Sequence, residues 1–194
     1  MMEKKKIIND IIRNRRSIFP SMFSDEKIDD KIILDILENA RWAPNHKMTE
    51  PWKYIVFTGD TLKDLSDFCG EAYRKLVPPD KFSEMKYNKT KKKILSSSHV
   101  IAVCLNRSVE INIPEWEELA ALAMSVQNLW LSVSAYGLGG YWSSPKYISI
   151  ANEFLKLKEN QSCMGFFYLG VPQPNIELKS ERKPLLEKVT WFTA

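Results

Sequence analysis

The chain has 194 residues, of which 44% are hydrophobic and 27% are charged, a composition typical of a folded protein with one sizeable core. Its formal net charge of +4 is too small to indicate nucleic-acid binding, and its two histidines and three widely spaced cysteines exclude a histidine-rich or CxxC-type metal site. These properties predict one domain over residues 1–194, with reduced core thiols and a cytoplasmic location.

Two segments bear on membrane association, and neither supports it. The charged residues 1–6 precede an apolar segment that is soon interrupted by polar residues, unlike a signal peptide. Residues 119–145 carry no charge and exceed the ~20 residues that span a bilayer. However, they include Gln127, Asn128 and three glycines, which lipid-facing helices rarely contain together. We therefore expect a helix inside the fold.

The first half of the chain alternates between helix and strand signals. Residues 4–14 are typical of a short helix. Ser24 is expected to cap a second helix that ends by Pro44, because apolar residues follow at helical spacing: Ile28, Ile32, Ile36 and Ala40. Aromatic and β-branched residues predict a strand over 52–58, and a helix is expected over 62–76. The lysine-rich residues 86–93 indicate a solvated loop or helix face, with a binding patch as the alternative.

The second half predicts one long helix and three further strands. A short apolar run favours a buried strand over 100–105. Residues 115–136 are apolar almost all round, which predicts a helix enclosed by the fold. A turn leads to a short strand after Gly137, a helix is expected over 148–157, and a buried strand over 164–171. The fold class is therefore α+β, with helices around a small sheet.

Two loops carry side chains suited to a phosphorylated ligand. Arg15, Arg16 and Ser17 follow the first helix, and an arginine fork with a hydroxyl fits phosphate oxygens. Two arginines at a helix end also occur as a solvated cap that the helix dipole favours. His46 lies in a proline-framed loop before a buried strand, where it can serve a ligand or bond to backbone.

Two later segments complete the set of candidates. The glycines at 137–140 indicate close backbone approach or tight turns, and they follow a helix, the reverse of the Rossmann order. Trp142, Ser143 and Ser144 follow them and can present polar groups to a heteroaromatic edge. In the tail, Arg182 and Lys183 precede an apolar end, residues 185–192, which we expect to pack against something, naturally a partner subunit.

The order and separation of these segments over nearly the whole chain resemble the nitroreductase family, especially its small single-domain subgroup. The matching segments are Arg15 to Ser17, Ala43 to Trp52, Gln127 to Trp142 with its Gly-Leu-Gly-Gly run, and Tyr168 to Gln173. The resemblance implies a small, mostly antiparallel sheet with helices around it. It also implies a homodimer with FMN at the interface and a C-terminal arm that extends to the partner subunit.

The resemblance also assigns cofactor-binding residues. It implies that Arg15 and Ser17 bind the FMN phosphate, with Arg16 nearby and Arg182 adding charge. Backbone groups of Trp142, Ser143 and Ser144 are implied to line the flavin ring, and Trp42 and His46 to contact flavin from the second subunit. The implied activity is ping-pong hydride transfer from NADH or NADPH to a nitroaromatic or quinone. It requires no catalytic acid or base.

Three positions depart from the family pattern. Glu50 stands where relatives often have Gln or Asn, Phe19 where some have a lysine near the flavin, and Trp42 where the subgroup has an arginine. All three make the expected ring environment less positive. The alternatives are therefore another flavin reaction, such as dehydrogenation, dehalogenation or flavin fragmentation, or a flavin-binding protein without turnover. The sequence leaves the acceptor and the choice between NADH and NADPH open.

Overall fold

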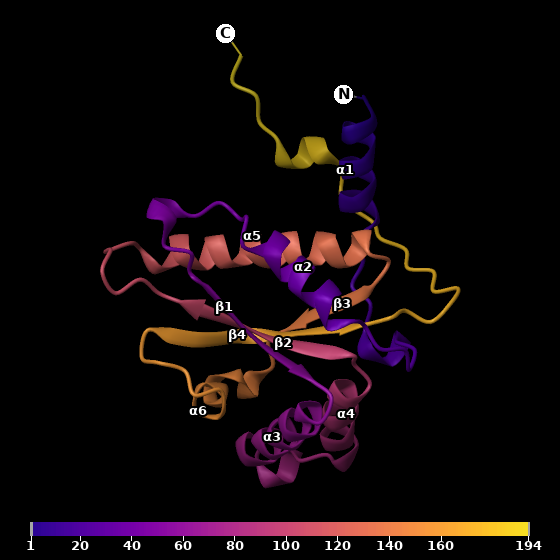
Figure 1. The fold of residues 1–194 in the computed structure, drawn as a ribbon, viewed down its shortest axis with the longest axis vertical. Helices are drawn as coiled ribbons and strands as arrows, with labels where there is room; N and C mark the ends of the chain where they lie inside the picture. The colour runs from indigo at the N-terminus through magenta and orange to yellow at the C-terminus, as the bar shows by residue number, and fades with distance from the viewer. Residues whose placement is uncertain (1, 194) are drawn as a thin grey trace.

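The computed structural model of the chain describes residues 2–193, which fold around one four-stranded sheet (Figure 1). The strands lie in the order β1-β2-β4-β3, and every neighbouring pair is antiparallel. This arrangement confirms the predicted α+β class. The strand bounds are β1 Trp52–Thr58, β2 His99–Asn106, β3 Gly139–Ser143 and β4 Gln161–Gly170.

The two faces of the sheet carry separate apolar clusters because side chains alternate along each strand. On β2, Val100, Ala102 and Cys104 join the cluster that packs against α3 (Thr61–Leu76) and α4 (Glu84–Leu95). The intervening residues, among them Ile101 and Val103, join the cluster beneath α2 (Asp30–Ala40) and α5 (Glu115–Ala135). Helices thus cover both faces, and β2 and β4 form the buried centre (Figure 1).

Two predicted helices differ from those observed, and the sequence leaves a third segment open between a loop and a helix. Ser24 does not cap the second helix; Asp29 does, accepting a hydrogen bond from the Lys31 amide at 2.8 Å, and Ile28 lies before the helix. The lysine-rich segment is helical, as part of α4. The helix expected over 148–157 is instead a 3-10 turn, Lys146–Ile150, followed by the single turn α6, Ala151–Phe154.

The central helix α5 occupies the predicted residues, but the expectation that the fold encloses it was wrong for a single chain. One face, including Leu122, Val126 and Leu129, is fully buried against the sheet. The opposite side exposes Trp116 and Met124, with Trp116 69% accessible. Its all-round apolar character therefore leaves an uncovered face in one protomer.

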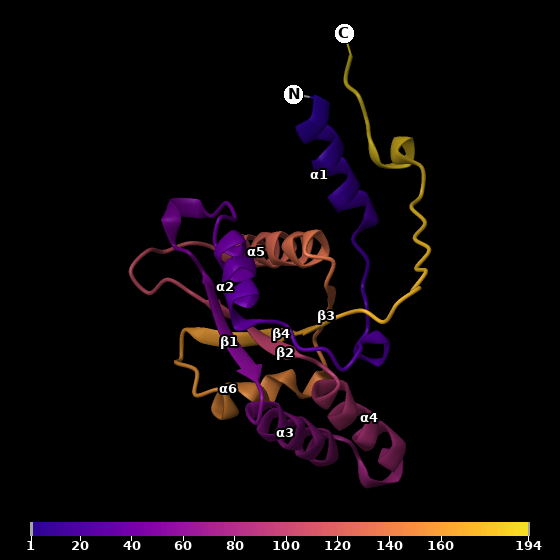
Figure 2. The same cartoon turned by 45° about the vertical axis from the view of Figure 1, so that its right-hand side comes forward.

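Both ends of the chain project from the body on the same side (Figure 2). Helix α1 spans Met2–Asn14, and the tail beyond Pro172 is extended apart from a short turn, Leu185–Lys188. The tail's apolar residues stay exposed in the single chain; Phe192 is 98% accessible. Residues 2–193 therefore leave the apolar residues 185–192 largely uncovered.

Two further expectations concern thiols and membranes. Cys69, Cys104 and Cys163 are all free and buried, as predicted. None of the helices within residues 2–193 combines the length and apolar character required to cross a bilayer.

Candidate cofactor site

The segment that leaves α1 runs along the exposed edge of the sheet. The last turn of α1 is continued by the Arg15 amide, which donates to the Ile11 carbonyl at 3.0 Å. Three residues later the Ile18 amide donates to the Gly140 carbonyl of β3, also at 3.0 Å. This second bond fixes residues 15–19 beside β3, so that the arginine pair and the glycine-rich strand occupy one region.

Arginines from both ends of the chain line one cavity of about 450 Å³. The sequence-predicted residues Arg15, Arg16 and Arg182 meet there. Gln127, which projects from α5, was not predicted as a site residue, although it belongs to the motif that matches the family. The complete lining is Ile12, Arg13, Arg15, Arg16, Gln127, Ser180 and Arg182.

Arg15 has the strongest character of a ligand-binding residue in this cavity. Its guanidinium lies 4.5 Å from the centroid of the Trp130 ring, and within residues 2–193 its buried Nη1 atom has no hydrogen-bond partner. Burial, and then the charges of Arg182 and Arg16, lower the pKa of Arg15. A buried donor without an acceptor is costly, so the cavity is suited to an anion.

The neighbouring predicted residues have different positions. The Arg16 guanidinium donates hydrogen bonds to two backbone carbonyls, that of Leu178 at 3.2 Å and that of Arg13 at 2.6 Å. These bonds connect the tail to the end of α1. Arg182 donates to the Ser180 hydroxyl at 2.6 Å, which orients it along the tail. Ser17 is half-buried in the segment beside β3.

The edge strand β3 presents the predicted residues Trp142 and Ser143, and Ser144 follows it. Trp142 is half-buried, and its indole Nε1 is enclosed with no acceptor in the described chain. Its neighbour Gly165 has φ +141°, and a Cβ there would lie 2.7 Å from that Nε1 and 2.6 Å from the Ser143 carbonyl oxygen. Glycine is therefore required for β4 to approach the end of β3.

The glycines before Trp142 have a structural explanation. A Cβ on Gly140 would lie 2.7 Å from the Phe167 ring. Gly140 thus lets the backbone approach the Phe167 ring closely, and Gly137, at φ +69°, makes a tight turn, so each of the two expected explanations applies to one glycine.

Lys93 places a positive charge near Phe19, the position where some relatives have a lysine. The Phe19 ring lies 4.5 Å from the Tyr141 ring, and Lys93 Nζ lies 4.8 Å from the Tyr141 centroid and 4.1 Å from the Tyr168 centroid. Burial lowers the pKa of Lys93 to about 8. The sequence interpretation missed this residue because it lies in a run of lysines that was assigned to a solvated face.

The remaining predicted residues lie in the loop between α2 and β1. Trp42 is 73% exposed, and its indole donates to the Glu38 carboxylate at 3.1 Å. His46 is exposed and lies 2.5 Å from the Glu117 carboxylate, measured from Nδ1. Glu50 is exposed at φ +44°, with its amide bonded to the Asn45 side chain at 3.0 Å.

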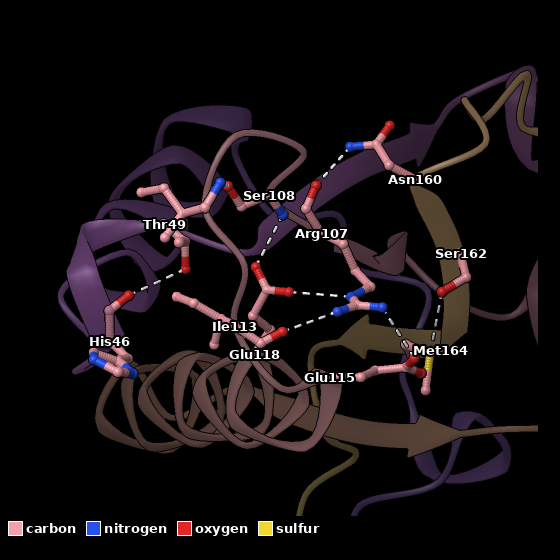
Figure 3. A network of polar contacts seen from close by, with 11 residues as sticks. His46, Thr49, Arg107, Ser108, Ile113, Glu115, Glu118, Asn160, Ser162 and Met164 are labelled. Carbon is pink, nitrogen blue, oxygen red and sulfur yellow. Dashed lines mark hydrogen bonds and ion pairs between the residues drawn. The ribbon is translucent and has the colours of Figure 1, made fainter.

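A polar network fixes the start of α5 beside this loop (Figure 3). Glu118, only 2% exposed, accepts hydrogen bonds from Arg107 Nε at 3.1 Å and from the Ser108 amide at 2.9 Å. Arg107 also donates to the Ile113 carbonyl at 3.0 Å. The buried carboxylate is thereby satisfied, and the network holds the helix end from which Glu117 reaches His46.

One protomer does not bring all the predicted residues together. Arg15 stacks on Trp130 and His46 contacts Glu117, and these two partners lie 13 positions apart on α5. At 1.5 Å per helical residue, that separation is about 20 Å along the helix. His46 therefore lies apart from the cavity that Arg15, Arg16 and Arg182 line.

Comparison with known proteins gives one consistent result. The family model described as "Nitroreductase family" matches residues 12–171. A Bacillus subtilis (strain 168) protein with the provisional name NAD(P)H nitroreductase YfhC is 30% identical over 191 residues, covering 97% of this chain and 96% of its own.

Two solved structures share the fold over nearly the full length. A nitroreductase-like family protein from Bacillus cereus has a TM-score of 0.79 at 28% identity, covering 95% of both chains. A Desulfovibrio desulfuricans protein, provisionally named a nitroreductase and solved in complex with FMN, has a TM-score of 0.73 at 26% identity and covers 96% of both chains.

Proposed function

Because this chain belongs to the nitroreductase family, we propose that it is an FMN-dependent NAD(P)H oxidoreductase that reduces nitroaromatic or quinone-type acceptors. Bound FMN would supply hydride and electron transfer, taking electrons from NADH or NADPH and passing them to the acceptor in a ping-pong sequence. The chain's own residues hold and orient the cofactor, and none acts as an obligatory acid or base. We also propose a cytoplasmic location, which rests on the three reduced thiols.

The proposal depends most on the cavity that Arg15, Arg16 and Arg182 line, here called the arginine cavity. Arg15 and Arg182 line it, and Arg15 Nη1 is buried without an acceptor among residues 2–193. A phosphate would accept from that donor and neutralise the mutual repulsion of the arginines. Ser17, with Arg16 beside it, completes the proposed phosphate-binding segment. The FMN complex of the Desulfovibrio relative supports the same ligand.

The ring end of the cofactor is proposed to lie along β3. Trp142, Ser143 and Ser144 would face it with backbone groups, and Trp142 Nε1 is a second buried donor that lacks an acceptor in the described chain. Lys93, behind Phe19 and Tyr141, would add positive charge that favours the reduced, anionic ring. Glu50 is exposed and bonded to its own loop in the single chain, which limits its effect there.

A homodimer accounts for the divided site and the uncovered apolar surfaces. His46 contacts Glu117, about 20 Å along α5 from the Trp130 ring on which Arg15 stacks, so His46, with Trp42 in the same loop, would contact flavin bound mainly by the partner. The apolar side of α5 and the projecting tail, including Trp116 and Phe192, would be covered by that second copy. The tail is thus proposed to extend to the partner subunit.

Cofactor titration of the apoprotein tests the proposal. Arg15→Gln should weaken FMN binding by about 10- to 100-fold, because a charged hydrogen bond contributes about 1.5–3 kcal/mol. Arg74→Gln is the matched control, since Arg74 pairs with Glu71 on α3 and should leave affinity unchanged. Quenching of flavin fluorescence measures both.

Two outcomes would contradict different parts of the proposal. If the wild-type protein binds no FMN, the flavoenzyme assignment is wrong. If it binds FMN that neither NADH nor NADPH reduces in the absence of oxygen, the cofactor stands and the reaction is a different one.

A further inference from the structure

A second cavity, of about 470 Å³, lies between α4 and the short turn Pro20–Met22. One wall is apolar and aromatic, formed by Phe19, Pro20 and Tyr141. The other wall carries three amines of α4, those of Lys89, Lys92 and Lys93. Ser21 and Ser96 complete the lining.

The charge of this cavity is not balanced by acidic side chains. Lys91, on the same helix, pairs with Asp67 at 2.7 Å. In contrast, none of the three cavity lysines forms an ion pair with any residue between 2 and 193. The cavity therefore presents uncompensated positive charge beside aromatic rings.

Unlike the other two lysines of the cavity, Lys93 is held in place by the side chains around it. It is half-buried between the Tyr141 and Tyr168 rings, and the buried Tyr168 hydroxyl lacks a partner in the described chain. Lys89 and Lys92 are exposed at the mouth. An incoming anion would thus meet mobile ammonium groups first and a fixed one behind them, beside apolar walls that strengthen the attraction.

We propose that this cavity selects electron acceptors that carry a carboxylate on an aromatic ring. The ring would pack on Phe19 and Tyr141, and the carboxylate would bind Lys89 and Lys92. This inference rests on the proposed function, because Phe19 and Tyr141 flank the segment and strand that would hold the flavin ring. The inference adds to the proposed function a preference for negatively charged acceptors.

Steady-state kinetics of the FMN-loaded enzyme with two matched acceptors test the preference. 4-Nitrobenzoate and 4-nitrobenzamide share the ring and the nitro group, but only the first is charged at neutral pH. The double variant K89Q/K92Q should raise KM for 4-nitrobenzoate about tenfold, with less than a twofold change for the amide. The control K81Q/K86Q removes the same charge from exposed residues that do not line the cavity and should change neither KM.

The results separate failure of the inference from failure of the proposed function. An unchanged KM for 4-nitrobenzoate in K89Q/K92Q would overturn the inference. Equal losses for both acceptors, accompanied by weaker FMN binding, would also overturn it, because the lysines would then serve the cofactor. If the FMN-loaded wild type reduces neither of these acceptors nor a quinone, the proposed function fails. The cavity can then still be tested by titrating the FMN-loaded protein with 4-nitrobenzoate or with the amide and following the flavin absorbance. Equal affinity for the two compounds would refute the inference.

Discussion

Lys93 destabilises the fold that contains it, because its ammonium is half-buried and has no carboxylate partner among residues 2–193. We expect Lys93→Met to raise the free energy of unfolding at pH 7 by about 1 kcal/mol, the desolvation cost being partly offset by lost contacts with two tyrosine rings. Urea denaturation measures the change. Lys89→Met, at an exposed position of the same helix, should leave stability unchanged.

The pH dependence of that difference provides an independent check. Burial, opposed by Cys69 and reinforced by Lys89, lowers the pKa of Lys93 from 10.5 to about 8. Below pH 8 both folded and unfolded chains carry the proton, so the full cost is present. Between pH 8 and 10.5 the folded chain releases its proton first, and wild-type stability rises relative to Lys93→Met. A gap that stays constant over this range would contradict a buried charge.

The sequence predicted three of the four arginines that line the arginine cavity, but not Gln127 in the same lining or the half-buried Lys93. Arg15 and Arg182 belong to short motifs whose chemistry is evident from residue type. Lys93 has its character only because Tyr141 and Tyr168, from two distant strands, enclose it. No local pattern contains that information, so a lysine run is assigned to solvent by default.

At the scale of elements, the close approach of β3 and β4 depends on Gly165. Gly165→Ala should destabilise the protein by roughly 2–4 kcal/mol, because the backbone is strained at φ +141° and the new Cβ would overlap the Ser143 carbonyl oxygen. Gly59→Ala is the matched control: its φ is also positive, at +54°, but no atom lies within 4 Å of its Cβ, so about 1 kcal/mol is expected. Thermal unfolding compares the two. Equal costs would show that the contact with β3 is unimportant.

The strands were predictable from sequence and several helix ends were not, for physical reasons. Strand β1 is rich in aromatic and β-branched residues and β2 is a short apolar run, so their composition alone identifies them. Ser24 and Asp29 are both good capping residues, and the choice is made by tertiary contacts: the Ser24 amide bonds to Val171, and Asp29 caps α2. The apolar pattern of α5 correctly predicted that the helix packs against the sheet. It did not predict that, in a single chain, only one side of the helix is covered.

At the scale of the whole molecule, a site shared between subunits predicts complementation. Arg15→Gln protomers and protomers with Trp42→Ala and His46→Ala should each bind FMN weakly alone. Mixed dimers would contain one site with both defects and one with none, so mixing should restore about half of the wild-type binding sites per heterodimer. Flavin absorbance after co-refolding measures the recovery. No recovery in verified heterodimers would place each site within one protomer.

The arginine cavity has a consequence for synthesis of the chain. Arg15 lies near the first residue and Arg182 near the last, yet both line the same cavity. A ribosome must therefore translate the whole stretch from Arg15 to Arg182 before the two guanidinium groups can meet. Chains released before residue 182 would lack that arginine and the apolar residues after it, so the proposed flavin site could not form in them.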